Sequence, residues 1–417
     1  MFSERTNWRL AQNRYTQAVE EVRAAGKKIF DLTASNPTRV GLEYDSAAIL
    51  QALGSARALD YDPQAKGLLD AREVVARYYR ERQVASNVST VDSENIVLTT
   101  STSEGYSFVF RLLCNAGDEL LVPKPSYPLF DFLADLQDVK LVPYPLIYDH
   151  GWQMDFPSLE KAVTKRTRGV VVVHPNNPTG SYVHAEEVGP LNAFCREHGL
   201  ALIVDEVFLD YRVEGAGKNI RSLDCARDDN TSTRHDDRST RDDNSFAENR
   251  EVLTFTLSGL SKISALPQMK VAWVVTSGPA HEASAAMARL EVIADTYLSM
   301  NAPVQWAVPA LLEQRREIQR QLLTRVRKNL AELDRQLAGQ TGCQRLSVEG
   351  GWYAVLRVPV TRSDEELAIA LVREKSVLVH PGHFYDFPKD GFLVLSLITA
   401  ENEFAEGMGK VLHYLAS

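Results

Sequence analysis

RGVVVVHPNNPTGSYVHAEEVGPLNAFCREHGLALIVDE, Arg168 to Glu206, carries the clearest structural pattern of the chain. Its runs VVVV and ALIV are short and wholly apolar, which is typical of strands buried on both faces of a sheet. The segment between them, residues 186–199, has the pattern of a helix. A strand, a helix and a second strand in this order predict a βαβ unit with parallel strands.

The alternation continues towards the N-terminus. NIVLTT (95–100) and DELLVP (118–123) have the character of strands, and EGYSFVFRLLC (104–114) lies between them with the pattern of a helix. We therefore expect an α/β fold in which helices cover a mostly parallel sheet.

A different pattern begins near residue 305. A long charged helix is predicted over roughly 306–338, and it is followed by the strand-like VEGGWYAVLRVPV and by a helix that starts at the capping signal TRSDEEL. We expect a smaller α+β domain made of residues 1–45 and 305–417, appended to a large domain over 46–304.

Residues 221–250 fit neither domain. They are rich in Asp, Arg, Ser, Thr and Asn and nearly free of aliphatic residues. Such a segment buries too little apolar surface to offset the entropy lost on ordering. It is predicted to be a disordered surface insertion, and a regulatory or partner-binding loop is the alternative.

The composition is that of a globular enzyme with a sizeable core. Of the 417 residues 44% are hydrophobic, and the net charge is −9, which argues against nucleic acid or anionic lipid as a partner. The four cysteines are scattered, so we expect no disulfides. No run is long enough to span a membrane, and the cytoplasm is the expected location.

Polar residues follow three of the predicted strands. Asp205 ends LALIVDE, Asn177 follows VVVVH, and Thr102 and Ser103 follow NIVLTT. Ligands of α/β proteins bind at the carboxyl ends of strands, and the start of a helix can hold a phosphate. Turns and helix caps explain the same residues without a ligand. Lys262, in SGLSKISALPQMK, is either a surface lysine or a desolvated amine that forms a Schiff base.

Together these segments resemble the class I/II aminotransferases of the fold-type I pyridoxal-phosphate family. The matching pieces occur in the family's order: YDPQAKGLLDAR (61–72), TTSTSEG (99–105), VPKPSYP (122–128), HPNNPTG (174–180), DEVFLDY (205–211) and SGLSKISALPQMK (258–270). The resemblance covers nearly the whole chain apart from 221–250. It implies a seven-stranded central sheet, pyridoxal 5′-phosphate as cofactor, and transfer of an amino group between an amino acid and a 2-oxo acid.

The resemblance also implies roles for single residues. Lys262 matches the Schiff-base lysine, and Asp205 matches the carboxylate that keeps the pyridine nitrogen protonated. Asn177 matches the amide that hydrogen-bonds the ring oxygen O3′, and Tyr127 matches the aromatic residue that stacks on the ring.

The phosphate of the cofactor is expected at a second group of residues. Ser101, Thr102 and Ser103 match the phosphate cup, and Lys270 stands where the family usually has an arginine that neutralises the phosphate. Tyr61 matches a tyrosine that reaches the phosphate of the neighbouring subunit, which implies a homodimer with shared active sites. An ordinary half-buried tyrosine is the alternative for this position.

Several positions depart from the family pattern. Phe208 stands where many relatives have a tyrosine that donates to O3′, and Gly259 where they often have a phosphate-binding serine. Val394 appears at the position of the arginine that grips the substrate's carboxylate. Arg39, with Asn36 in the same loop, is our first candidate to replace it, although Arg39 also suits a surface loop.

Two other functions remain open on these residues. One is β-elimination by a carbon–sulfur lyase on the same scaffold, and the other is a non-catalytic pyridoxal-phosphate-binding regulator. His380 and His383 are separated by a Pro-Gly turn and have no third ligand nearby, so no metal site is expected.

Overall fold

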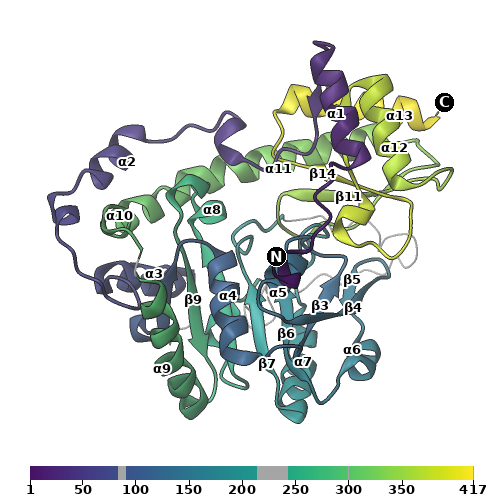
Figure 1. Cartoon of the computed structure of the whole chain (residues 1–417). Helices are drawn as coiled ribbons and strands as arrows, with labels where there is room; N and C mark the ends of the chain where they lie inside the picture. Colours follow the sequence, from purple (N-terminus) through teal and green to yellow (C-terminus); the bar gives the residue numbers. More distant parts are fainter. Residues whose placement is uncertain (83–90, 214–242, 299, 417) are drawn as a thin grey trace, which may run out of the picture.

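An eight-stranded sheet forms the centre of the larger part of the molecule (Figure 1). The computed structural model describes residues 1–82, 91–213, 243–298 and 300–416, and strand counts refer to these. In sheet order the strands are β2 (Ile96–Thr99), β9 (Ala272–Ser277), β8 (Thr254–Gly259), β7 (Ala201–Asp205), β6 (Thr167–Val173), β3 (Glu119–Lys124), β4 (Lys140–Tyr148) and β5 (Trp152–Met154).

The middle of this sheet is parallel. β8, β7, β6, β3 and β4 pair in parallel, whereas β9 runs antiparallel to both its neighbours and β5 runs antiparallel to β4. The predicted α/β class with a mostly parallel sheet is confirmed. The predicted number of seven strands is one fewer than the eight strands of the central sheet in the described chain, and the short edge strand β5 has only three residues.

Apolar residues of the central strands point alternately into two cores. In β6, Val171 and Val173 pack with the core on one face, and Val170 and Val172 with the core on the other. This two-residue period explains why the run VVVV is apolar throughout. The helices around the sheet are α2 (Ser46–Leu53), α3 (Leu69–Arg82), α4 (Thr102–Leu113), α5 (Phe130–Asp135), α6 (Phe156–Ala162), α7 (Ala185–His198), α8 (Leu260–Ile263), α9 (Ala280–Tyr297) and α10 (Ala302–Glu313).

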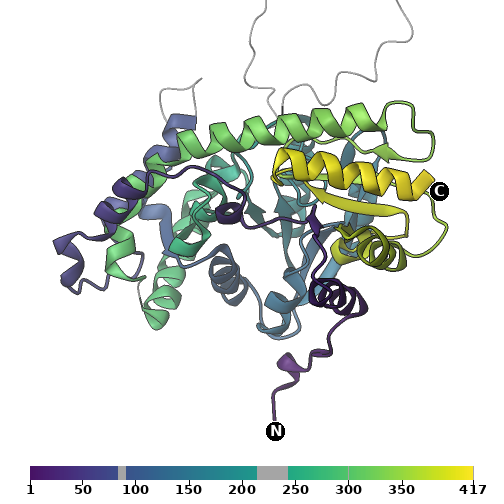
Figure 2. The same cartoon turned by 90° about the horizontal axis from the view of Figure 1, so that it is seen from above.

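The smaller part of the molecule combines both ends of the chain. Its sheets have the orders β10 (Gln344–Arg345), β11 (Tyr353–Arg357), β14 (Phe392–Ser396), β13 (His380–Pro381), and β1 (Phe30–Asp31), β12 (Val377–Leu378). Its helices are α1 (Arg14–Ala24), α11 (Arg315–Leu337), α12 (Asp364–Ala370) and α13 (Glu401–Ala416). Figure 2 shows α11 and α13 side by side. The predicted domain boundaries at 45/46 and 304/305 stay a prediction.

Within the smaller part, a buried side-chain amide connects α11 to the segment that follows β14. The side chain of Asn329 donates hydrogen bonds to the backbone oxygens of Leu397 and Thr399, at 2.9 and 2.8 Å. The single helix predicted over 306–338 is in fact two helices, α10 and α11, which meet at Gln314.

The end of the predicted disordered segment is ordered. Residues 246–248 form a short 3-10 helix, and Phe246 is buried. Its backbone N–H donates to the carboxylate of Glu206 at 2.6 Å. The prediction for 221–250 is therefore wrong at residues 243–250, because Phe246 contributes apolar burial and a hydrogen bond that the composition did not reveal. Residues 221–242 lie outside the described part of the chain.

Two further observations concern the described residues. Cys114, Cys195 and Cys343 are free thiols, and Cys225 lies outside the described chain. Among the helices that the structure describes, none is both long and apolar enough to cross a membrane.

Gly259 has a packing reason of its own. It pairs with Ala272 across β8 and β9, and a Cβ atom placed on it would lie 2.8 Å from the Cβ of Ala272 and 2.8 Å from the backbone oxygen of Val271. The close approach of the two strands therefore leaves no room for the serine of the family pattern.

We predict that Gly259→Ala lowers the free energy of unfolding by about 1–3 kcal/mol, because the added methyl group overpacks against backbone. Urea denaturation would measure the change. Gly189→Ala is the matched control, since Gly189 lies inside helix α7 with nothing within 4 Å of an added Cβ. That variant should be neutral or more stable by up to about 1 kcal/mol. Equal effects at both positions would contradict the packing explanation.

Candidate active site

A cavity of about 470 Å³ lies at the carboxyl ends of β6 and β7, where the turn that follows β8 also lines it. Its size is ordinary for a small-molecule site. The residues that line it are Ser35, Thr102, Tyr127, Pro128, Leu129, Val173, Asn177, Asp205, Val207, Phe208, Ser261, Lys262, Tyr353, His380 and Tyr385. Both parts of the molecule therefore contribute to its wall.

Lys262 lies on the single turn of α8, directly after β8. Tyr211 donates a hydrogen bond to the backbone oxygen of Lys262 at 2.6 Å, which holds this turn in place. The ammonium group lies 4.8 Å from the ring centre of Trp352 and 5.5 Å from that of Phe208. Burial lowers the pKa of Lys262 to about 8, although Asp205 opposes the shift. The free amine is therefore accessible near neutral pH.

Asp205 is the last residue of β7 and is buried. Its carboxylate accepts hydrogen bonds from the backbone N–H of Val207 at 3.0 Å and from the hydroxyl of Tyr106 at 3.1 Å. Burial raises the pKa of Asp205 to about 6, and the two hydrogen bonds limit the rise. This carboxylate is held in a fixed direction at the cavity wall.

Tyr106 was not predicted as a site residue. It lies on α4, and its ring packs edge-on against Phe130 with the ring centres 5.2 Å apart. A tyrosine on the apolar face of a helix gives no sign of a partner in the sequence. Only the packing of α4 against the sheet brings its hydroxyl to Asp205.

Asn177 and Tyr127 lie on the same cavity. Asn177 is buried, and its side-chain oxygen has no hydrogen-bond partner among the described residues. A buried amide oxygen without a partner is costly, so this atom is suited to meet a donor on a ligand. The ring of Tyr127 is about one-third exposed and meets Phe130 edge-on, with the ring centres 6.0 Å apart.

The residues at the start of α4 differ in what they contact. Ser101 is the N-cap, and its hydroxyl accepts the backbone N–H of Glu104 at 3.2 Å. Thr102 lines the cavity, whereas Ser101 and Ser103 are not among the lining residues. The first residue of α4 therefore lies at the cavity, and the N-terminus of a helix is suited to hold an anion.

Other predicted site residues lie away from the cavity wall. Asn36, Arg39 and Lys270 are exposed and do not line it. The side-chain oxygen of Asn36 accepts hydrogen bonds from Thr38. Tyr61 is 78% exposed and lines a separate hollow.

The smaller part of the molecule supplies lining residues that the sequence did not indicate. They are Tyr353 on β11, His380 on β13, Tyr385, and Ser35 in the loop after β1. No motif singles them out, because the cavity forms only where this part folds against the ends of the central strands.

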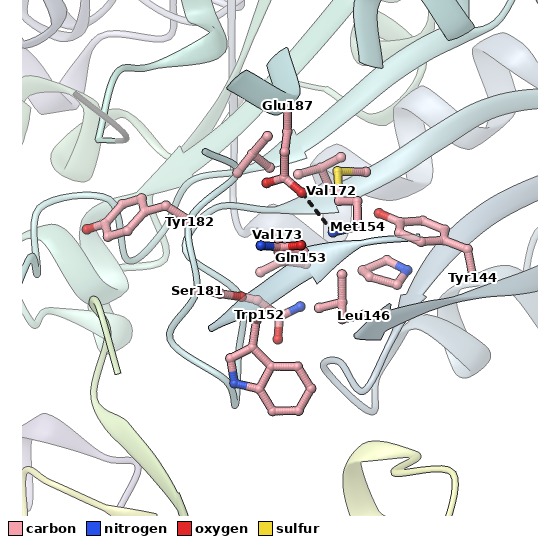
Figure 3. A pocket seen from close by; sticks show the side chains of 13 residues that line it. Tyr144, Leu146, Trp152, Gln153, Met154, Val172, Val173, Ser181, Tyr182 and Glu187 are labelled. Atoms are coloured by element: carbon pink, nitrogen blue, oxygen red, sulfur yellow. Dashed lines mark hydrogen bonds between the residues drawn. The ribbon is translucent and has the colours of Figure 1, made fainter. Parts of the chain in front are cut away.

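A second, much smaller cavity lies behind the HPNNPTG loop. It measures about 20 Å³, and Figure 3 shows Glu187, Trp152 and Tyr144 around it. The carboxylate of Glu187 accepts the backbone N–H of Met154 at 2.8 Å. This space would hold about one water molecule, which excludes it as the site of an organic ligand.

The fold and the larger cavity define a class of protein. A lysine with a lowered pKa and a fixed carboxylate share a crevice at the carboxyl ends of parallel strands. This combination is suited to an enzyme that handles amines and carbonyl compounds, because a free amine attacks carbonyl carbon.

Residues 8–403 match the family model of aminotransferase class I and II, and the chain belongs to this family. A curated relative is the glutamate-pyruvate aminotransferase AlaA of Haemophilus influenzae, 26% identical over 94% of this chain and 91% of its own. The alanine aminotransferase of Mycobacterium bovis is 26% identical over 96% of this chain and 89% of its own. The solved alanine aminotransferase of Pyrococcus furiosus covers both chains fully, with a TM-score of 0.84 and 20% identity.

The protein is thus a pyridoxal-phosphate-dependent aminotransferase. Its cavity suits the cofactor in three respects. The volume is sufficient, the carboxylate of Asp205 is buried with Lys262 partly buried in the same cavity, and the side-chain oxygen of Asn177 has no hydrogen-bond partner among the described residues.

Glu206, the residue after Asp205, is a buried carboxyl whose ionisation should make the stability of the fold depend on pH. Burial raises the pKa of this carboxyl to about 7, although hydrogen bonds from Ser245 and from the backbone of Phe246 oppose the shift. The folded protein binds this proton more tightly than the unfolded chain does. Glu206 therefore contributes stability below about pH 4.5 that is lost as the pH rises towards 7.

We predict that the free energy of unfolding of Glu206→Gln, relative to wild type, rises between pH 5 and pH 8 by up to about 3 kcal/mol, since glutamine does not ionise. Urea unfolding at several pH values would measure this. The exposed Glu282→Gln is the control and should show no such trend. A difference for Glu206→Gln that stays flat with pH would contradict the prediction.

Proposed function

We propose that Lys262 carries pyridoxal phosphate covalently and moves the proton at the substrate's Cα atom. The observation that carries this proposal is that the partly buried Lys262 and the buried Asp205 line one cavity at the ends of the central strands, and the lowered pKa of Lys262 agrees with it. When bound, the cofactor supplies a carbonyl group that accepts the amino group and a ring that withdraws electrons. The free amine of Lys262 acts as base and its protonated form as acid, which suits a pKa near 8.

The other lining residues bind and orient. Asp205 pairs with a protonated ring nitrogen, and the hydrogen bond from Tyr106 keeps the carboxylate in position. Asn177 meets the ring oxygen O3′, and Tyr127 stacks on the ring. Phe208 lies in the cavity wall without a hydroxyl to donate.

The phosphate group belongs at the start of α4. Ser101, Thr102 and Ser103 lie there, and the helix N-terminus favours an anion. Of these three residues, Thr102 lines the cavity. The other predicted roles stay predictions, because the residues do not line the cavity in the single chain; they are those of Ser101, Ser103, Lys270, Tyr61, Asn36 and Arg39.

The substrates are an amino acid and a 2-oxo acid. The printed names of the curated relatives include glutamate-pyruvate and alanine aminotransferases, so alanine, glutamate and pyruvate are the first compounds to test. The cytoplasmic location stays a prediction.

We predict that Lys262→Ala abolishes covalent attachment of pyridoxal phosphate and lowers kcat by at least about 10³-fold. Borohydride reduction and peptide mass analysis would locate the attached cofactor. Lys270→Ala is the control, because Lys270 is an exposed lysine eight residues later, and it should keep the covalent link. A reduced adduct that persists in Lys262→Ala would overturn the assignment.

Transamination and β-elimination differ in stoichiometry. Given an amino donor alone, an aminotransferase stops after one turnover and leaves pyridoxamine phosphate, whereas a lyase releases a keto acid and ammonia continuously. The protein is mixed with each of a panel of amino donors, and absorbance and ammonia are measured over time. One turnover without ammonia supports transamination, and continuous release of ammonia supports β-elimination.

A homodimer is part of the proposal. Leu59 is 90% exposed and Tyr61 78% exposed, beside a hollow of about 380 Å³ that Arg57 and Trp306 also line. Exposed apolar side chains that gather beside a hollow, unlike single scattered ones, are suited to contact with a partner.

We predict that light scattering gives about twice the chain mass of 46.6 kDa, and that Leu59→Glu shifts the protein towards monomer because it places a charge in the contact. Val360→Glu is the control, since Val360 is also exposed but lies on the smaller part. A wild-type protein that is monomeric at micromolar concentration would rule out the dimer.

A further inference from the structure

The cavity lacks the usual cation for a substrate's acid group. Among the described residues that line it, none is an arginine, and Lys262 is the lysine already assigned to the cofactor. Val394, at the position of the family's arginine, is buried in the core of the smaller part. Within the single chain, the carboxylate of an amino acid therefore meets another kind of donor.

His380 occupies the place beside Val394. The two residues are direct partners in the register of β13 and β14, and side chains of opposed residues lie on the same face of a sheet. His380, unlike Val394, lines the cavity. The sheet thus presents an imidazole one strand away from the position where relatives present a guanidinium.

The ring of His380 is oriented by Tyr385. Its Nδ1 atom lies 3.0 Å from the Tyr385 hydroxyl, and no residue that the structure describes hydrogen-bonds Nε2. When the phenol donates to Nδ1, the proton of the neutral imidazole is on Nε2. Burial lowers the pKa of His380 to about 4, with Asp31 opposing, so the ring is neutral at pH 7.

We propose that His380, held by Tyr385, binds the carboxylate of the amino acid and of the 2-oxo acid through a neutral Nε2–H donor, with Ser35, which also lines the cavity, as a second donor. This inference rests on the proposed function of the cavity. The site therefore binds the carboxylate by hydrogen bonds and not by an ion pair. Such binding is weaker than that of a bidentate arginine.

The test measures binding, so that it does not depend on turnover. Protein loaded with pyridoxal phosphate is titrated calorimetrically with 3-phenylpropanoate and with its neutral analogue 3-phenylpropanamide. Wild type should prefer the carboxylate, and His380→Leu should weaken carboxylate binding by about 10- to 100-fold with little change for the amide. His380→Gln, whose amide can donate from a similar reach, should retain part of the preference.

His383→Leu is the matched control, because His383 is an exposed histidine of the same segment that does not line the cavity. It should bind like wild type. An unchanged preference for the carboxylate in His380→Leu, or no preference in wild type, would overturn the proposal. If His380→Leu does not fold, His380→Gln and Tyr385→Phe decide, and wild-type affinity in both would also overturn it. Failure of the cofactor assignment is seen separately, in the Lys262→Ala experiment.

Discussion

Burial of a lysine and an aspartate in one crevice is the constraint on which the site depends. Burial disfavours the charged form of each residue, and it lowers the pKa of Lys262 to about 8 while it raises that of Asp205 to about 6. Neither group would serve on the surface, because the lysine would stay protonated and the carboxylate would be solvated. The chemistry of the enzyme follows from where these two side chains are enclosed.

The parallel sheet produces this enclosure through its register. Val173, Asp205 and Leu257 are neighbours on β6, β7 and β8. β6 and β7 end at this level, and β8 continues to Gly259. Segments that follow them, which carry Asn177 and Lys262, must then lie at the same edge. Gly259 allows β8 and β9 to approach closely just before the turn of Lys262.

Aromatic side chains stabilise the residues around the reacting groups. Tyr211 holds the backbone of Lys262, and Tyr106 holds the carboxylate of Asp205. Both contacts join residues that are distant in the chain. Tyr385 contacts the ring of His380 within one segment. The cavity wall thus has an ordered arrangement although some of its residues depart from the family pattern.

The sequence by itself determined the α/β class and the segments that carry Lys262, Asp205, Asn177 and Thr102, because apolar strand patterns and the residues that follow them are local features. It did not determine the contribution of Tyr106 or Tyr385, nor the order at Phe246. Tertiary structure alone decided that His380, rather than the loop residue Arg39, lies on the cavity wall. The physical reason is that a site between two parts of a fold is defined by packing across long sequence separations, which no local pattern records.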